Sequence, residues 1–350
     1  MYYRLEAEGF ELVLADPRQV KNLPGRPERD PPDSRWIAQC FERGAIRGCF
    51  VATPEFRLIR EHTRYRRDLT AGRVREKQRA EKLLEAAGIK ISSVLSDLHG
   101  VTGRDIMDHL IAGERNPEVL AQLARTTARR KTGQLEHAVE GAEFFTPALA
   151  ALPGRMLARI DELGAAIGEL TAVIETLLEP YEEQLQQIES MPGWGRLSAQ
   201  DALAGTGADM TRFLTGGHLA SWAGRTPLDR QSGRRTGKAK VKKGNRYLGA
   251  VTGETAVAAG RTQTREGARY RRIARRRGKL KACVAADNTQ LKVYHKLLST
   301  PGARYEDLGV DYYDTQASTR RQIRQLEKRA REFGYALVPD LTSCTEATEP

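Results

Sequence analysis

The stretch MLARIDELGAAIGELTAVIETL, residues 156–177, predicts the helical body of this chain. Its apolar side chains recur at spacings of four and three residues, which is the heptad pattern of a helix that packs against another helix. The pattern ends just before Pro180. This seam can pack against a long helix of the same chain or against a second copy of the protein, and the sequence does not distinguish these two arrangements. We also expect the protein to form a homo-oligomer. Its members are Met156, Ile160, Leu163, Ile167, Leu170, Ile174 and Leu177.

A long polar helix is predicted upstream of the seam. Thr53 is suited to an N-cap, Pro54 to the first helical position and Gly88 to the residue just past the end. Its many arginines indicate either a solvated face or a face toward nucleic acid, and the sequence favours neither. Shorter helices are expected between Gly103 and His137.

The N-terminal segment predicts a small α/β part. The apolar run Phe10–Ala15 is typical of a buried strand, and it follows a helical stub at residues 2–8. Another helix is expected around Trp36–Cys40. Because one strand cannot make a sheet, we expect the chain to start partway through an α/β unit.

The positive charge of the chain is concentrated in one window. Between Arg225 and Lys281 there are nineteen Lys or Arg residues and three acidic ones, a charge of +16 against +12 for all 350 residues. Like charges crowded together repel unless a partner neutralises them, so the window predicts a surface that binds a polyanion. We expect DNA or RNA as that partner.

Composition argues against several other classes. No apolar run reaches the roughly 20 residues needed to cross a bilayer, and the N-terminus lacks the apolar region of a signal peptide. The four cysteines form no CxxC pair and have no His at ligand spacing, which argues against a disulfide framework and a zinc site. We therefore expect a cytoplasmic protein without a membrane partner.

A glycine-rich turn, Met191-Pro-Gly-Trp-Gly195, precedes another apolar helical pattern. It resembles a helix-hairpin-helix, in which backbone N–H groups at a helix start bind a phosphate. A plain turn between two helices is the alternative.

Two carboxylates, Asp30 and Asp33, stand within one turn of a predicted helix start. They are close enough to share a divalent cation that oxygen ligands hold. Capping is the alternative, because an acid before proline suits an N-cap and an acid at the third position suits the helix dipole. The spacing alone favours capping.

Ser232 lies in a basic, glycine-rich stretch, residues 231–238. A serine hydroxyl attacks only when its proton is removed and the developing charge is stabilised, and nearby arginines can stabilise that charge at a phosphodiester. A serine beside glycine is otherwise a turn residue. Two rival serines lie in predicted helices with less charge around them, Ser198 and Ser221.

Taken in order along the chain, these motifs resemble one family, the DEDD-type transposases of the bacterial insertion-sequence "one-ten" family, which are bridge-RNA-guided recombinases. The resemblance covers nearly the whole chain, and several motifs in one order are more specific than any motif alone. The matching stretches are residues 16–26, Asp30-Pro-Pro-Asp33 with Trp36, Met191–Gly195, Gly217–Gly224, Gln231-Ser-Gly233 and Lys243-Gly-Asn245.

With the helical patterns, the resemblance implies a fold that is mainly α with a small α/β part. A truncated RuvC-like (RNase H-like) domain with the long basic helix is expected over residues 1–140. A coiled-coil linker follows over 141–186. The C-terminal transposase domain, with the helix-hairpin-helix and the serine loop, is expected over 187–336, and a disordered tail over 337–350.

The resemblance also implies a chemistry. Ser232 would attack a DNA phosphodiester to form a phosphoserine link, while Asp30 and Asp33 would hold Mg²⁺ near the scissile phosphate. A guide RNA would choose the DNA by base pairing, in a bacterial, nucleoid-associated protein. The expected nucleic-acid contacts are Gly193, Gly195, Arg230, Arg234, Arg235, Lys238, Lys240, Lys242, Lys243, Arg271, Arg272, Arg275 and Arg276.

The chain departs from the family pattern at its start. The family's first Asp and its Glu precede a Tyr-rich helix, whereas this sequence begins at Met1-Tyr-Tyr, after both. We expect Mg²⁺ binding to be weak here, and either a start codon assigned too late or a decayed gene. The expected function is that of a DNA transposase or recombinase. The alternatives are a catalytically dead nucleic-acid-binding remnant and a junction nuclease that does not need Ser232.

Overall fold

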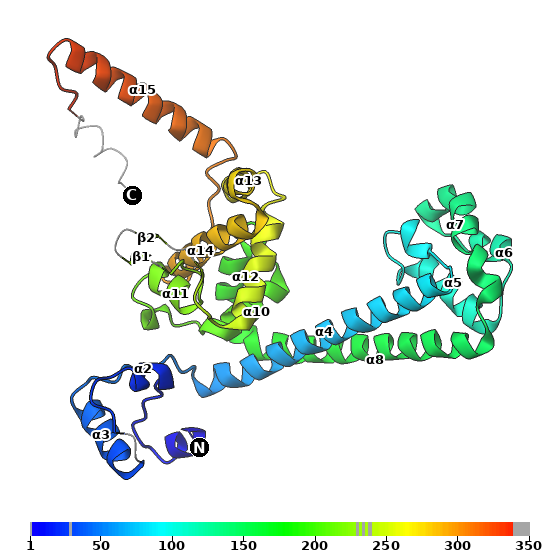
Figure 1. The fold of residues 1–350 in the computed structure, drawn as a ribbon, viewed down its shortest axis with the longest axis horizontal. Helices are drawn as coiled ribbons and strands as arrows, with labels where there is room; N and C mark the ends of the chain where they lie inside the picture. Colours follow the sequence, from blue (N-terminus) through cyan, green and yellow to red (C-terminus); the bar gives the residue numbers. More distant parts are fainter. Residues whose placement is uncertain (1, 28–29, 229–230, 233–234, 237–239, 339–350) are drawn as a thin grey trace. The chain divides into compact units, whose positions relative to one another are not determined.

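The computed structural model describes residues 2–27, 30–228, 231–232, 235–236 and 240–338, and at Asp30, Ser232 and Arg235 it describes the backbone alone. The chain forms two compact units (Figure 1). One consists of Leu58–Glu182, and the other combines Met1–Arg57 with Glu183–Pro350. Both are built almost entirely of helices, which confirms the prediction of a mainly α protein.

The unit of residues 58–182 is built on two long helices, of which the first begins just before the unit. The predicted helix boundaries hold, because α4 begins at the expected proline and α8 ends two residues before Pro180. The elements are α4 (Pro54–Ala86), η1 (Ile91–Ser93), α5 (Val101–Ala112), α6 (Pro117–Gln122), η2 (Thr126–Lys131), α7 (Thr132–Ala138), η3 (Glu140–Phe144), α8 (Pro147–Leu178) and η4 (Glu179–Tyr181).

The heptad seam of α8 faces partly inward within this unit. Ile160, Leu163 and Ile174 are buried, whereas the other members of the seam are only half-buried. A Cβ added at Gly72 of α4 would lie 3.9 Å from a methyl group of Leu163, so α4 and α8 run side by side there (Figure 1). Of the two packing partners that the sequence allowed, the structure therefore provides the long helix of the same chain. Whether a second copy also binds stays a prediction.

The second unit contains the helices that carry the basic window. Its first segment has α1 (Tyr2–Ala7), α2 (Pro17–Lys21) and α3 (Asp30–Glu42). Its second segment has α9 (Glu182–Glu189), α10 (Arg196–Thr206), η5 (Met210–Arg212), α11 (Gly216–Trp222), β1 (Gln231–Ser232), β2 (Arg235–Thr236), α12 (Arg246–Ala259), α13 (Arg265–Arg277), α14 (Lys279–Leu298) and α15 (Tyr312–Glu332).

Helix α14 is the centre of this second segment, since α11, α12 and α13 all pack against it. Tyr294 of α14 is fully buried, and its hydroxyl lies 2.7 Å from the hydroxyl of Thr206 in α10. The ring of Trp194 packs beside it, with the two ring centroids 5.9 Å apart. This apolar core, with its few satisfied hydroxyls, gives the basic elements a rigid support.

The prediction of a buried strand at Phe10–Ala15 is wrong. The segment forms one isolated bridge, Ala15 with Gly48, and Phe10 and Leu14 are 58% and 48% exposed. A strand needs neighbours for its backbone groups, and in the described residues only the segment around Gly48 pairs with it. The RNase H-like domain stays a prediction. None of the described helices is both long and apolar enough to cross a membrane.

Candidate nucleic-acid interface

The first half of the basic window folds as a β-hairpin. Strands β1 and β2 pair antiparallel, with Ser232 directly opposite Arg235. Below them Pro227 bridges to Val241, and the amide of Leu228 donates to the carbonyl of Lys240 at 2.8 Å. The two residues between the strands lie outside the described part of the chain. The backbone thus places Ser232 next to the turn of the hairpin, with a basic residue across from it.

The hairpin leaves the helical body at a crossing of two glycines. A Cβ on Gly224, whose φ is +72°, would lie 2.6 Å from the carbonyl oxygen of Lys242, and a Cβ on Gly244 would lie 2.2 Å from that of Ala223. No side chain fits at either position. Asn245 then caps α12, accepting a hydrogen bond from the amide of Tyr247 at 3.0 Å. The two motifs that end at Gly224 and Asn245 therefore meet at the base of the hairpin. We call residues 224–228 and 240–245 the stem.

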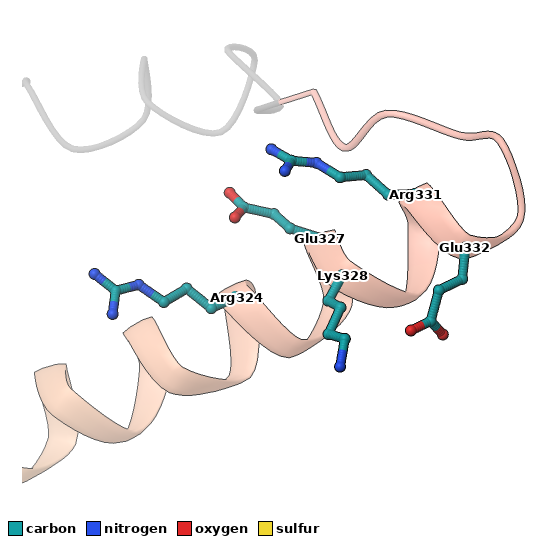
Figure 2. A pocket seen from close by; sticks show the side chains of 5 residues that line it. All are labelled: Arg324, Glu327, Lys328, Arg331 and Glu332. Carbon is teal, nitrogen blue, oxygen red and sulfur yellow. The ribbon is translucent and has the colours of Figure 1, made fainter.

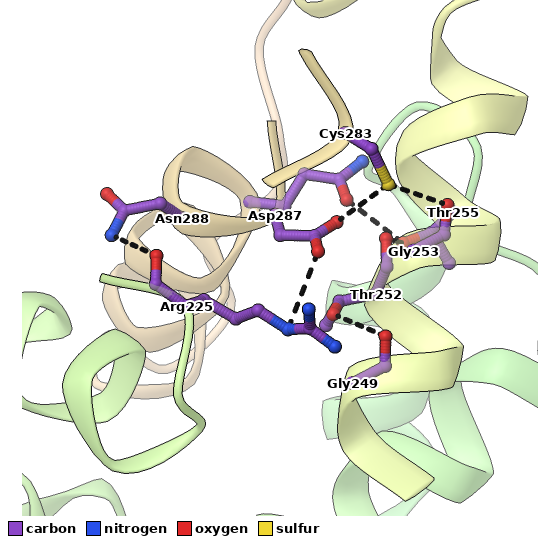
Figure 3. Close-up of polar contacts among 9 residues, drawn as sticks. Arg225, Gly249, Thr252, Gly253, Thr255, Cys283, Asp287 and Asn288 are labelled. Atoms are coloured by element: carbon purple, nitrogen blue, oxygen red, sulfur yellow. Dashed lines mark hydrogen bonds and ion pairs between the residues drawn. The ribbon is translucent and has the colours of Figure 1, made fainter. Parts of the chain in front are cut away.

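A buried ion pair lies at this stem (Figure 3). The Nε atom of Arg225 lies 3.5 Å from Oδ2 of Asp287 in α14, whose side chain is fully buried. Asn288 donates to the carbonyl of Arg225 at 3.1 Å. Burial raises the pKa of Asp287 to about 7, although the charge of Arg225 and the hydroxyl of Thr252 oppose the rise.

The thiol of Cys283 lies beside this pair. Its sulfur is 4.0 Å from Oδ1 of Asp287 and 3.7 Å from the carbonyl oxygen of Gly253. Burial raises the pKa of this thiol, and the carboxylate of Asp287 raises it further. Cys283 is thus a neutral packing group and not a reactive thiolate.

The arginines of α13 divide into two groups. Arg275 and Arg276 are exposed, and they make no hydrogen bond or ion pair with the described part of the chain. Arg271 instead donates to the carbonyls of Gly260 and Thr262, at 3.0 and 2.7 Å. Arg271 thus holds the loop between α12 and α13 in place. Its predicted contact with nucleic acid competes with this internal role.

The structure describes some of the remaining basic residues that were predicted to contact nucleic acid. Lys240, Lys242 and Lys243 are exposed on the returning strand of the stem. Arg272 of α13 is also exposed, with its guanidinium 5.9 Å from the ring centre of Tyr313. Three predicted contacts lie outside the described residues, namely Arg230, Arg234 and Lys238.

The predicted helix-hairpin-helix turn joins α9 to α10, and packing explains its first glycine. Gly193 has a φ of +83°, and a Cβ there would lie 2.4 Å from the carbonyl oxygen of Thr255 in α12. The amide of Gly195 is taken by the hydroxyl of Ser198, at 2.9 Å. Of the two glycines in this turn, only Gly195 is exposed. Phosphate binding by the turn stays a prediction.

The two rival serines have different surroundings. The hydroxyl of Ser198 donates to the carbonyl of Gly195 at 2.7 Å, so it caps the start of α10. Ser221 is exposed near the end of α11. Neither lies on the hairpin, and Ser198 already has a local hydrogen-bonding role.

The acidic pair lies at the start of α3. The two carboxylate oxygens of Asp33 accept hydrogen bonds from Nε and Nη2 of Arg26, at 2.9 and 2.8 Å. The Arg26 guanidinium holds the pKa of Asp33 below its usual range. Nowhere among the described residues do three or more His, Cys, Asp or Glu side chains gather as a metal site. Two carboxylates, one of them engaged by an arginine, do not by themselves fit the oxygen ligands that Mg²⁺ requires.

A second basic helix, α15, was missed by the sequence analysis. Figure 2 shows Arg324, Lys328 and Arg331 on its surface, beside two glutamates, around a shallow pocket of about 350 Å³. The same helix exposes 46% of Ile323 and 53% of Leu326. The density of Lys and Arg between residues 320 and 331 was the available signal.

Two comparisons with protein families point to one class of protein, the transposases. Residues 185–271 match the family described as transposase IS116/IS110/IS902, and residues 1–89 match a DEDD-type transposase model of the IS110 group. The first match includes the stem, the hairpin and part of α13, and the second includes Asp30 and Asp33. The two matches cover different parts of the chain, and both support a transposase of the IS116/IS110/IS902 family.

Two curated relatives come from insertion elements. An uncharacterized 42 kDa protein of IS900 from Mycobacterium paratuberculosis is 32% identical over 133 residues, 38% of this chain and 31% of the relative. An uncharacterized 44.8 kDa protein of IS116 from Streptomyces clavuligerus is 27% identical over 260 residues, 67% of this chain and 62% of the relative. The matches thus span less than two thirds of either relative.

Proposed function

We propose that this chain breaks and rejoins DNA as the transposase of an insertion element, with Ser232 as the nucleophile. The observation that carries the proposal is the hairpin inside the region that matches the family, which presents Ser232 beside its turn and opposite Arg235. The serine oxygen would form a bond to phosphorus while the bond from phosphorus to the leaving DNA oxygen breaks. The serine hydroxyl loses its proton and the leaving DNA oxygen gains one, and attack by a DNA hydroxyl on the phosphoserine would reverse the step.

The exposed basic residues would hold the DNA. Arg275, Arg276 and the three lysines of the stem make no ion pair in the described part of the chain, so their charge is available to phosphates. We further propose that a bound RNA selects the DNA by base pairing, which rests on the order of the motifs and on the family. The same basic surface suits the backbone of either nucleic acid.

A divalent metal is the third partner that we propose, since the DEDD class uses such ions. When bound, it would polarise the scissile phosphate. Asp30 and Asp33 are the residues proposed to hold it, but the described carboxylates do not complete its ligand set. We therefore derive no step of the reaction through the metal.

The test is a covalent protein–DNA adduct that survives denaturing electrophoresis. Full-length protein is incubated with element-end DNA, the element's RNA and Mg²⁺, and the adduct is mapped by peptide mass. Ser232→Ala should keep its fold and its DNA affinity but lose the adduct. Ser198→Ala and Ser221→Ala are the matched controls, and both should retain it. An adduct that persists in Ser232→Ala, or that maps to Ser221, contradicts the assignment.

The second candidate is a nucleic-acid-binding protein without catalytic activity. The observation that favours it is the engagement of both oxygens of Asp33 by Arg26, which leaves them little capacity to bind a metal. Under this alternative the unmutated protein binds DNA and RNA with a steep dependence on salt but gives no adduct at any Mg²⁺ concentration.

A further inference from the structure

We propose that Arg225 and Asp287 are positioning residues that hold the Ser232 hairpin in one place on the helical body. That these two residues fix the position of the hairpin does not depend on what the hairpin does. Its effect on strand transfer rests on the proposed function, in which Ser232 is the nucleophile.

The pair lies where the hairpin leaves the body. Arg225 directly follows the glycine crossing and precedes the first bridge of the hairpin, Pro227 with Val241, by two residues. Its side chain reaches Asp287 on α14, and its carbonyl accepts a hydrogen bond from Asn288, one residue further along the same helix. Both ends of Arg225 are therefore tied to one helix.

A third contact fixes the guanidinium of Arg225. A Cβ added at Gly249 of α12 would lie only 1.9 Å from its Nη2 atom, so the guanidinium lies directly against the backbone of that helix. Arg225 is thus confined between α12 and α14, as Figure 3 shows. In the described part of the chain, Asp287 is also faced by the hydroxyl of Thr252 and the neutral thiol of Cys283.

A buried ion pair is a poor way to gain stability. Apolar side chains of similar size often stabilise a core as well or better, because the charges lose their hydration. Arg225 and Asp287 attract each other through charge alone, because Nε and Oδ2 are 3.5 Å apart and neither atom has a hydrogen-bond partner in the described part of the chain. The orientation of Arg225 is fixed by this attraction together with the Asn288 hydrogen bond and the contact with Gly249. The pair therefore fits a role in setting the direction of the stem more than a role in stabilising the unit.

The direction of the stem matters for a nucleophile at the far end. A reacting oxygen must lie within a few ångströms of phosphorus and in line with the leaving group, and a displacement of about 1 Å can cost about a hundredfold in rate. Small rotations at the foot of a hairpin become larger displacements at its turn. The pair therefore controls the rate of attack and not the affinity for DNA.

The first measurement is amide hydrogen exchange of the full chain, with Asp287→Asn. We expect the stem amides, such as that of Leu228, to exchange at least about tenfold faster, while α12 and α14 keep their protection. The matched control is Tyr294→Phe, which removes a buried hydroxyl contact of the same core away from the stem. Unchanged exchange in the stem of Asp287→Asn, or an equal increase in Tyr294→Phe, overturns the proposal.

The second measurement is the rate of adduct formation against pH, together with DNA affinity. In the unmutated protein the rate should rise as Asp287 ionises, because only the carboxylate attracts Arg225. Asp287→Asn should be slower by about tenfold or more, without that rise and with unchanged affinity, and Asp287→Glu should restore part of the rate. A rise that persists in Asp287→Asn overturns the effect on catalysis. Faster stem exchange in a protein that never forms adducts would contradict the proposed function alone.

Discussion

Two arginine–aspartate pairs of this chain contain the same charges in opposite surroundings. The side chains of Arg26 and Asp33 are 36% and 17% exposed, whereas those of Arg225 and Asp287 are 21% and 0% exposed. The first pair makes two short hydrogen bonds, and its arginine lowers the pKa of the aspartate. In the second pair burial wins over the charge of the arginine and raises that pKa. The comparison teaches that an arginine lowers the pKa of an aspartate when it donates hydrogen bonds to an accessible carboxylate, and that its charge alone does not offset full burial.

The largest expected effect is on the pH dependence of stability. The pKa of Asp287 is about 7 in the folded chain and near 3.8 when unfolded, so the folded chain binds more protons between these values. The free energy of unfolding should therefore fall as pH rises from about 4 to 7. Asp287→Asn should remove a fall on the order of 3 kcal/mol. Denaturant unfolding of the unmutated protein and of Asp287→Asn at pH 5 and pH 8 measures this fall. An equal change in the free energy of unfolding between the two pH values in both proteins would contradict the prediction.

A smaller effect is expected when the buried arginine is displaced. Gly249→Ala places a Cβ against Nη2 of Arg225, so the pair must separate at a cost of about 1–3 kcal/mol. Gly253→Ala on the same helix is the control, since its Cβ would lie at an ordinary 3.7 Å from the sulfur of Cys283. Both variants gain the same helix propensity, which cancels in the difference. Equal unfolding midpoints for the two variants would show that Arg225 moves freely.

The smallest effect is expected at the surface pair. Arg26→Gln should raise the pKa of Asp33 back toward 3.8, as measured by carboxyl chemical shifts in an NMR titration. A lowered pKa means that the stability from this pair is present above about 3.8 and is lost as pH falls through the folded value. The control is Arg35→Gln, which changes an exposed arginine of α3, the helix that contains Asp33, and it should leave the pKa of Asp33 unchanged. A shift in both variants would indicate a general charge effect and not the pair.

Local signals explain which helices were predictable. The long helix expected from Thr53 to Gly88 is α4, Pro54–Ala86, because caps and prolines act within a few residues of themselves. The run Phe10–Ala15 carried a strand signal of equal quality, yet it forms a single bridge. Pairing of strands depends on partners elsewhere in the chain, which a local pattern does not contain.

The sequence predicted that the candidate site is positively charged, but it did not predict which way the individual side chains point. The basic window was visible in the sequence, and Ser232 as the nucleophile stays a prediction. The inward role of Arg271 was not visible, since a count of arginines says nothing about where each one points. The Arg225–Asp287 pair joins residues 62 positions apart, and an aspartate in a helical sequence looks like a solvated one. The side chains of Asp30 and Ser232 lie outside the description, so their roles stay proposals.

The crossing of Gly224 with Gly244 makes the hairpin a detour in the chain. The backbone leaves and returns at the same point, and Arg225 at its base is the residue of this arm that packs between α12 and α14. Lengthening, shortening or exchanging the hairpin therefore need not alter the packing of α11, α12 and α14.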